Sequence, residues 1–351
     1  MRPSERRRHR ATRLLPAALV LAAGLATAPA KAADPAPINL RFADSIPKTH
    51  PISVYGSKFW MDMVTRLTKG RVTFQWYPAG QLGKGADLLA LTASGAVDVG
   101  STGPSYTPAK LPLSAVAELP EMFASTCAGS KAYWDLLKPG GMLDKLEYAP
   151  KHMHVLFAFT NPPYEVQTVH HAVVLPKDMK GLKFKTLGGA SDDSALLVGG
   201  VPVQMTVADL YLGLKRGTVD GRFGAFNSVF ANSTQDVLQY STVGADIGGF
   251  GLVALINDQK WQALGPEVQA AMLQAGDATW QNFCRHEDAE NGQIGQELAG
   301  KHHWKLAVLD AAQQAEWQTM MRPVQQQWAD ELDKRGLPAS QVLAGFRAAV
   351  K

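Results

Sequence analysis

Short apolar strands alternate with segments of helical spacing along most of this chain, and this alternation most limits how it can fold. A strand at 39–42, a helix at 52–67 and a half-buried strand at 72–77 form the first unit. A helix at 85–94 and a strand at 97–100 follow. Strands that alternate with helices are typical of α/β proteins with parallel strands. We therefore expect an α/β fold.

The same alternation continues in the second half and ends in long helices. Strands are expected at 155–159, 181–186, 219–221 and 252–256, and helices at 130–137, 191–198, 207–215, 311–335 and 340–350. Residues 266–299 keep a helical pattern, which corresponds to about 50 Å of helix. A helix of that length can run across two lobes. The prolines after Phe159 and the glycine-rich segment 244–251 suit hinges between lobes.

The N-terminus has the pattern of an export signal. Six arginines lie within residues 1–13, an apolar run covers 14–28, and small residues follow up to position 33. A basic start, a short apolar stretch and a small-residue exit are typical of a secretory signal peptide. The run is shorter than a membrane span and contains Pro16 and Gly24. We predict that 1–33 is a signal peptide and that the mature protein is periplasmic.

Removal of this signal changes the charge of the protein. The whole chain has 35 Lys+Arg and 31 Asp+Glu, a net charge of +4. Taking away seven basic residues and one acidic residue leaves 28 against 30, a net charge of −2. Such a balance offers no electrostatic footprint for nucleic acid, so no nucleic-acid partner is expected. No later segment reaches 18 consecutive apolar residues, so no further membrane span is expected.

The two cysteines allow two interpretations. Cys127 and Cys284 are too far apart for a C-x-x-C redox or zinc pattern. An oxidising compartment permits a disulfide between them. The alternative is two buried thiols that act as small hydrophobic side chains. The sequence leaves both open.

Signatures of enzymes and metal sites are scarce. The chain has no G-x-S-x-G, no H-E-x-x-H and no G-x-G-x-x-G after a strand. The Gly-Gln-Leu-Gly-Lys stretch at 80–84 lacks the glycine spacing of a phosphate loop. His152 and His154 share one face of a strand, but no third ligand is indicated nearby. We therefore expect no enzyme activity, no metal and no cofactor.

Five segments resemble, in order, the solute-binding proteins of TRAP (tripartite ATP-independent periplasmic) transporters, the DctP-type family. They are Trp-Tyr-Pro-Ala-Gly-Gln-Leu-Gly at 76–83, Ser-Gly-Ala-Val-Asp at 94–98, Lys-Gly-Leu-Lys-Phe-Lys at 180–185, the Leu-Tyr to Asp-Gly stretch at 210–221, and Leu-Ile-Asn with Lys-Trp within 255–261. The resemblance implies a two-lobed periplasmic-binding-protein-like fold with hinge strands and a long lobe-spanning helix. The implied division is lobe I at 34–158 plus 246–275, lobe II at 159–245 plus 300–351, and 276–299 as part of the connecting helix.

The resemblance also implies a function. Such a receptor captures a small organic acid by lobe closure and delivers it to the small and large integral-membrane subunits of the transporter. The acid expected here includes aromatic acids and acids larger than usual for the family. An ABC-type receptor is an alternative, but it would lack the Gln-Leu-Gly and Leu-Ile-Asn segments seen here. A sensory receptor that reports to a membrane histidine kinase remains open. An exported hydrolase is disfavoured because no nucleophile elbow is present.

The implied binding site departs from the family pattern at several positions. Where the family has an arginine that grips the ligand carboxylate, this chain has Lys185, which keeps the charge without the planar fork. Where the family has a second arginine, this chain has Tyr164. Where the family commonly has Phe and Asn in the pocket, this chain has the smaller Val207 and Gly224, and these replacements should enlarge the pocket. Arg222 stands where the family usually has a neutral residue, so the site gains one charge.

These positions give a hypothesis for ligand binding. Lys185 and Arg222 would hold the carboxylate, with Tyr164 as a hydrogen-bond donor. The alternative is that Lys185 and Arg222 are solvated charges on the surface. Phe159 and Phe226 would form apolar walls, unless they are ordinary core residues. The remaining candidates would offer polar groups, and they are Ser101, Thr102, Gly103, Asn161, Gln167, His50, Ser45 and Asn227.

Overall fold

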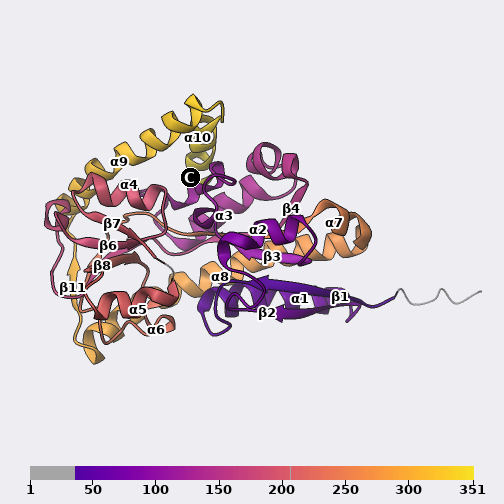
Figure 1. Cartoon of the computed structure of the whole chain (residues 1–351), viewed down its shortest axis with the longest axis horizontal. Coiled ribbons are helices and arrows are strands. Elements are labelled where there is room, and N and C mark those ends of the chain that lie inside the picture. The colour runs from indigo at the N-terminus through magenta and orange to yellow at the C-terminus, as the bar shows by residue number, and fades with distance from the viewer. Residues whose placement is uncertain (1–35, 206) are drawn as a thin grey trace, which may run out of the picture. The chain divides into compact units, whose positions relative to one another are not determined.

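Two β-sheets organise the chain in a computed structural model that describes residues 36–205 and 207–351. The first, sheet A, has the strand order β2-β1-β3-β10-β4. Its strands are β1 (Ile38–Asp44), β2 (Val72–Tyr77), β3 (Val99–Thr102), β4 (Met153–Thr160) and β10 (Gly251–Asn257). Figure 1 shows β1, β2 and β3 in the right half of the view, with α1 (Phe59–Leu67) near β1 and β2.

The second sheet, sheet B, has the order β11-β9-β5-β8-β6-β7. Its strands are β5 (Glu165–Thr168), β6 (Lys183–Thr186), β7 (Val201–Gln204), β8 (Gly221–Gly224), β9 (Tyr240–Val243) and β11 (Lys305–Val308). Each of these strands has only four residues.

Most strands run parallel, as predicted, but one strand in each sheet does not. β10 is antiparallel to β3 and β4, and β5 is antiparallel to β8 and β9. The reason lies in the connections between the sheets. The chain leaves sheet A from β4 and later returns to it as β10, so the returning strand lies beside the outgoing one in the opposite direction. The predicted α/β class is confirmed, with mixed rather than purely parallel sheets.

Helices fill most connections between strands. They are α1, α2 (Gly85–Ala93), α3 (Thr126–Leu137), α4 (Ala190–Leu197), α5 (Val207–Lys215), α6 (Asn227–Ala231), α7 (Asp258–Leu264), α8 (Pro266–Lys301), α9 (Ala311–Lys334) and α10 (Ala339–Val350). Shorter 3₁₀ or π segments are η1 (Ile52–Lys58), η2 (Pro104–Tyr106), η3 (Leu113–Glu118), η4 (Asp144–Tyr148), η5 (Ala149–Lys151) and η6 (Pro176–Met179). No helix of the described part of the chain is long and apolar enough to cross a membrane.

Two crossing segments, 161–164 and 244–250, connect the sheets without a helix. They are paired with each other: the Asn161 N–H donates to the Phe250 carbonyl (2.8 Å), and the Tyr164 N–H donates to the Gly248 carbonyl (2.8 Å). Gly248 has φ +131°, and a Cβ there would lie 2.8 Å from the Glu118 carbonyl oxygen. Only glycine fits this close approach. The predicted hinge positions therefore form a paired two-chain crossing.

The long helix α8 is the third connection, and the predicted helical run is confirmed with 36 residues. At its start, Trp60 Nε1 donates to the Met272 carbonyl beside sheet A (3.1 Å). Further along, Phe283 stacks on Phe159 of β4, with ring centroids 4.0 Å apart. Near its end, Gly295 packs against Phe226, which belongs to a core cluster of sheet B. One helix thus reaches the cores of both sheets.

The C-terminal helix α10 packs beside sheet A. Its Val342, Leu343 and Phe346 share one hydrophobic cluster with Tyr133 and Leu137 of α3. The sequence-based division assigns 300–351 to the lobe of sheet B, whereas the last part of that range contacts α3. Its apolar face explains the position, because burial against α3 removes those side chains from water. The exact lobe boundaries stay a prediction.

The two cysteines form a disulfide, which decides between the two interpretations of the sequence. Cys127 lies in the first turn of α3 and Cys284 in the middle of α8, with their Cα atoms 4.7 Å apart. The carboxylate of Asp288, one turn further along α8, accepts hydrogen bonds from the Thr126 and Cys127 N–H groups (2.7 and 3.1 Å). The start of α3 is therefore fixed to α8 covalently and by a carboxylate at the helix N-terminus.

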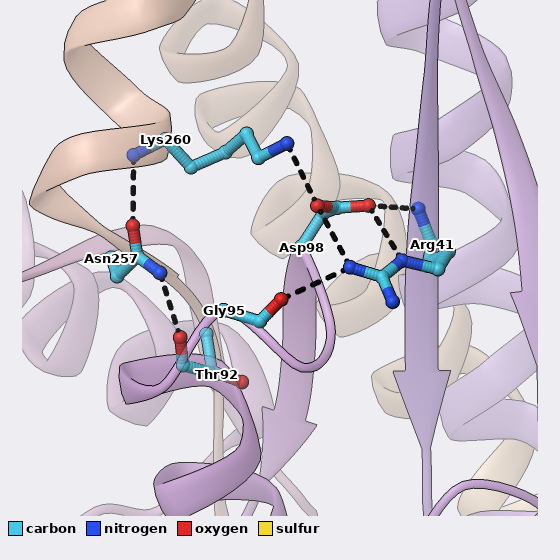
Figure 2. A network of polar contacts seen from close by, with 6 residues as sticks. All are labelled: Arg41, Thr92, Gly95, Asp98, Asn257 and Lys260. Atoms are coloured by element: carbon cyan, nitrogen blue, oxygen red, sulfur yellow. Dashed lines mark hydrogen bonds and ion pairs between the residues drawn. The ribbon is translucent and has the colours of Figure 1, made fainter.

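Two of the family-like segments meet in one polar network, which Figure 2 shows. Asp98, 5% exposed, accepts from the Arg41 backbone N–H (2.8 Å) and from Lys260 Nζ (2.9 Å). Asn257 Nδ2 donates to the Thr92 carbonyl (2.9 Å). Burial alone would raise the pKa of Asp98, but the hydrogen bonds from Arg41 and Lys260 lower it. The network joins β1, β3 and α7 at the starting end of β3, so these motif residues support sheet A.

Candidate ligand-binding site

A cavity of about 670 Å³ is lined by residues of both sheets and of the two crossing segments. From sheet A come the loops that follow β1, β2 and β3, and from sheet B the segments that end or follow β6, β7 and β8. All six are carboxyl ends of strands, where open α/β sheets usually bind their ligands. The strand directions therefore place this cavity where a small-molecule site is expected.

Lys185 and Arg222 are the two buried cations of the cavity. They are register partners in the parallel pair β6–β8, so their side chains leave the sheet on the same face. Their residues are only 7% and 3% exposed. Within the described ranges neither side chain has a carboxylate partner. A buried pair of like charges without a counter-charge is costly, so an anion in the cavity would relieve it.

Arg222 is held by neighbours that carry no charge. Its Nε donates to Gln167 Oε1 of the adjacent strand β5 (2.8 Å) and its Nη2 to the Ala225 carbonyl (3.4 Å). A Cβ at Gly224 would lie 3.0 Å from the guanidinium carbon of Arg222. Gly224 lies two residues after Arg222 on the same strand, and its lack of a side chain makes room for the guanidinium.

The electrostatics of the site favour an anion. Burial, and then the charge of Arg222, lower the pKa of Lys185 to about 7. Burial lowers the pKa of Arg222 to about 10. Burial and Arg222 lower the pKa of His50 to about 4, so this imidazole is neutral at neutral pH. A bound carboxylate would stabilise the charged form of Lys185.

The remaining walls combine polar and aromatic groups. Asn161 and Tyr164 of the first crossing segment line the cavity, and Asn161 Oδ1 is buried without a hydrogen-bond partner in the described chain. Tyr106 and Phe250 meet edge to face, with ring centroids 5.8 Å apart. Phe223 of β8 lines the cavity as well. Aromatic walls beside a cationic centre suit a ligand with an apolar body and an anionic head.

The structure brings six of the thirteen candidate binding residues together. The cavity is lined by Ser45, His50, Asn161, Tyr164, Lys185 and Arg222, together with Val207 and Gly224. The interpretation of the two cations as solvated surface charges is wrong, because both are buried. The role of each residue in binding stays a prediction.

The three side chains Phe159, Phe226 and Asn227 lie elsewhere. Phe159 is fully buried between β4 and α8, and Phe226 packs on α8. Asn227 Nδ2 donates to Glu287 Oε2 of α8 (2.6 Å). All three face the long helix rather than the cavity.

Residues 101–103 and Gln167 lie directly behind the lining residues. Thr102 Oγ1 donates to the Gly85 carbonyl (2.7 Å), and a Cβ at Gly103 would lie 2.4 Å from the ring of Phe250. Ser101 is completely buried in β3. Gln167 reaches the cavity only through its hydrogen bond with Arg222. These residues support the lining from the next layer.

Several lining residues were not predicted from the sequence, including Tyr106, Phe223, Phe250, Leu187 and Met205. A signal existed for some of them. Pro-Ser-Tyr follows β3 after Gly103, and Gly-Gly follows β6 after Leu187, with positive φ at both glycines (96° and 56°). Loops after parallel strands commonly line such sites. Phe223 gave no such signal, because it lies between Arg222 and Gly224 on a strand, where alternation predicts that its side chain points to the other face.

Known proteins with similar sequences were found by comparison. The model of the family described as "Bacterial extracellular solute-binding protein, family 7" (DctP) matches residues 42–331. The C4-dicarboxylate-binding periplasmic protein DctP of Rhodobacter capsulatus is 26% identical over 335 residues, which cover 93% of this chain and 97% of the relative. The 2,3-diketo-L-gulonate-binding periplasmic protein YiaO of Escherichia coli is 26% identical over 256 residues, which cover 73% and 76%.

Solved structures show the same fold. A TRAP solute-binding protein of Rhodoferax ferrireducens in complex with benzoate has a TM-score of 0.80 at 24% identity, over 89% of this chain and 97% of that one. A TRAP periplasmic solute-binding protein of Bordetella bronchiseptica with bound mandelate has a TM-score of 0.79 at 23% identity, over 90% and 99%. The predicted two-lobed binding-protein fold is confirmed.

Proposed function

The chain belongs to the bacterial extracellular solute-binding proteins of family 7, and we propose that it is the periplasmic receptor of a TRAP transporter that captures an organic carboxylate. Membership confirms the resemblance seen in the sequence. The ligand class rests on the cavity of this chain. The proposed periplasmic location rests on the family. The predicted signal peptide at 1–33 lies outside the described residues.

The observation that carries the proposal is the pair Lys185 and Arg222. Two cations on neighbouring strands point from one face of sheet B into the cavity, both buried, and no carboxylate of the described chain pairs with them. A ligand carboxylate would supply the missing charge and accept charge-assisted hydrogen bonds from both. Structural neighbours in complex with benzoate, mandelate or succinate support this ligand class.

The walls of the cavity favour an aromatic acid. A volume of about 670 Å³ has room for an aromatic ring. Tyr106, Phe223 and Phe250 offer ring surfaces at the walls. Apolar contact with these rings adds affinity that a short dicarboxylate cannot gain. An aromatic monocarboxylate therefore fits better than succinate.

Binding would close the cavity between the two sheets. The crossing segments 161–164 and 244–250, with α8, are the connections about which closure would occur. The closed receptor would then deliver the ligand to the small and large integral-membrane subunits of the transporter. We propose that selective binding and closure are the whole chemistry of this chain, without catalysis.

The experiment is isothermal titration calorimetry of the purified protein with benzoate, mandelate and succinate. Benzamide is the matched control, because it has the shape of benzoate without the charge. We expect benzoate and mandelate to bind more tightly than succinate and benzamide not to bind. A ligand at about 100 times its Kd should also add roughly 2.7 kcal/mol of stability in a thermal-shift assay. Binding of benzamide as tight as that of benzoate would contradict the proposal.

A further inference from the structure

A second, much smaller cavity adjoins the main one. Its volume is about 30 Å³, and its lining shares Lys185, Thr186 and Tyr164 with the main cavity. Three residues line the small cavity and not the main one, and they are Glu118, Ser191 and Gly249. A space of this size holds a water molecule or one polar group of a ligand. Lys185 thus lines two adjoining spaces, and Glu118 lines the smaller of them.

Glu118 is fixed in place by its backbone. It is the last residue of η3, and its carbonyl accepts from the Gly249 N–H in the second crossing segment (3.2 Å). Its carboxylate accepts two long hydrogen bonds from backbone N–H groups, those of Ser105 and Gly251 (both 3.4 Å). The residue is 9% exposed and has no cation partner among the described residues. Most of its hydrogen-bonding capacity is therefore unused.

Two more polar side chains around the small cavity have no partner in the described ranges. Thr186 Oγ1 is buried and makes no hydrogen bond there. Lys185, a residue that is 7% exposed, has no hydrogen bond or ion pair from its side chain in those ranges either. Buried polar groups normally find partners, so an unsatisfied ammonium, hydroxyl and carboxyl around one small space indicate a missing polar group.

We propose that this small cavity is a second polar subsite, which binds a hydroxyl group on the carbon next to the ligand carboxylate. The proposal rests on the proposed function, because Lys185 belongs to both cavities and would contact the carboxylate in the main one. A ligand group in the small cavity that contacts the same ammonium must lie close to the ligand carboxylate. A 2-hydroxy acid has such a group.

A hydroxyl fits the subsite better than other substituents. It can accept from Lys185 and also donate to or accept from Glu118. An ammonium group would lie beside the ammonium of Lys185, and a hydrogen atom would leave Glu118 and Thr186 without a ligand partner. Burial raises the pKa of Glu118 to about 8, which makes its carboxyl a donor at neutral pH. The hydroxyl oxygen can accept that bond.

The test is titration calorimetry with four acids that share one skeleton: phenylacetate, mandelate, phenylglyoxylate and phenylglycine. We expect mandelate to bind the wild-type protein about 10- to 100-fold more tightly than phenylacetate. In Glu118→Met this preference should fall below about threefold while phenylacetate binds as before. Glu118→Gln should retain the preference, because an amide also forms hydrogen bonds. Glu121→Gln, a nearby acid that lines neither cavity, should behave as wild type.

Other outcomes would overturn the subsite. They are equal binding of mandelate and phenylacetate by the wild type, tightest binding of phenylglycine, or a preference that survives in Glu118→Met. If Glu118→Met does not fold, Thr186→Val replaces it, with the same expected loss of preference for mandelate. Binding of none of the four acids would contradict the proposed function instead, so the two failures are distinguishable.

Discussion

Lys185 is a cation in surroundings that disfavour its charge. Its register partner is the cation Arg222, and burial removes the water that would otherwise stabilise the ammonium. Gly224 in turn leaves room for Arg222, since a Cβ there would lie 3.0 Å from its guanidinium carbon. A residue retained in this position despite its cost to folding is expected to serve binding.

Removal of the lysine side chain should therefore weaken binding without weakening the fold. We expect Lys185→Ala to lose about 2–5 kcal/mol of benzoate affinity, because Arg222 alone then holds the carboxylate. The melting temperature of the unliganded protein should stay the same or rise, since an unpaired buried charge is gone. Lys183→Ala is the control: Lys183 lies on the same strand but bonds to the Gly217 carbonyl (2.5 Å) and does not line the cavity. Equal losses in both variants would contradict this prediction.

The affinity should also depend on pH through Lys185. Burial and Arg222 lower the pKa of this ammonium to about 7, so the unliganded protein loses the charge as the pH rises. Benzoate affinity should therefore fall between about pH 6 and pH 9, and Lys185→Arg should retain its affinity, because arginine stays charged. Unliganded wild type should become more stable from about pH 7 to pH 10, because only the unfolded chain keeps the proton there. Identical pH profiles of benzoate binding in the two proteins would rule out Lys185 as the cause.

At the scale of single residues, the two cations predicted from the sequence line the cavity, but its aromatic walls were not predicted. Lys185, Arg222 and Tyr164 were recognisable because they depart from a family pattern. Phe159 and Phe226 were chosen as walls, yet both pack on α8. An aromatic residue on a strand or at a helix start has the same pattern whether it faces a core or a cavity. Only the packing of the distant helix α8 distinguishes the two.

At the scale of elements, most helices and apolar strands overlap the predicted ones, but β8 (Gly221–Gly224) overlaps the strand predicted at 219–221 by one residue, and α7 was not predicted. β2 and α5 begin and end where they were predicted, at Val72–Tyr77 and Val207–Lys215. The strands that the pattern missed, β5, β7, β9 and β11, have four residues each. Four residues are too few to establish an alternation of apolar and polar side chains, so their pairing with longer-range neighbours decides their conformation.

The disulfide between α3 and α8 should be a main source of stability at this scale. It closes a loop with a sequence separation of 157 residues. We expect its loss, by reduction or in Cys127→Ser/Cys284→Ser, to lower the free energy of unfolding by about 2–5 kcal/mol. Benzoate affinity should change little, since neither cysteine lines the cavity. Urea unfolding with and without reductant measures the effect, and an unchanged midpoint would show that the bond adds no stability.

At the scale of the whole molecule, the two sheets are joined by two paired crossing segments and one long helix. The cavity is lined by carboxyl strand ends from both sheets and by the crossing itself, so a ligand there touches every part that would move in closure. The family resemblance implied this organisation, and the positions of prolines, glycines and the long helical run in the sequence agreed with it. It did not predict the packing of α10 on α3, because an amphipathic helix does not reveal its partner.

A crystal structure of the complex with benzoate or mandelate tests the central claim most directly. We predict that the carboxylate lies between Lys185 and Arg222, with oxygen to nitrogen distances of about 2.7–2.9 Å, and that the ring lies against Tyr106, Phe223 and Phe250. A carboxylate directed away from both cations, or a ligand bound outside the main cavity, would contradict the assignment of Lys185 and Arg222 as the anion-binding pair.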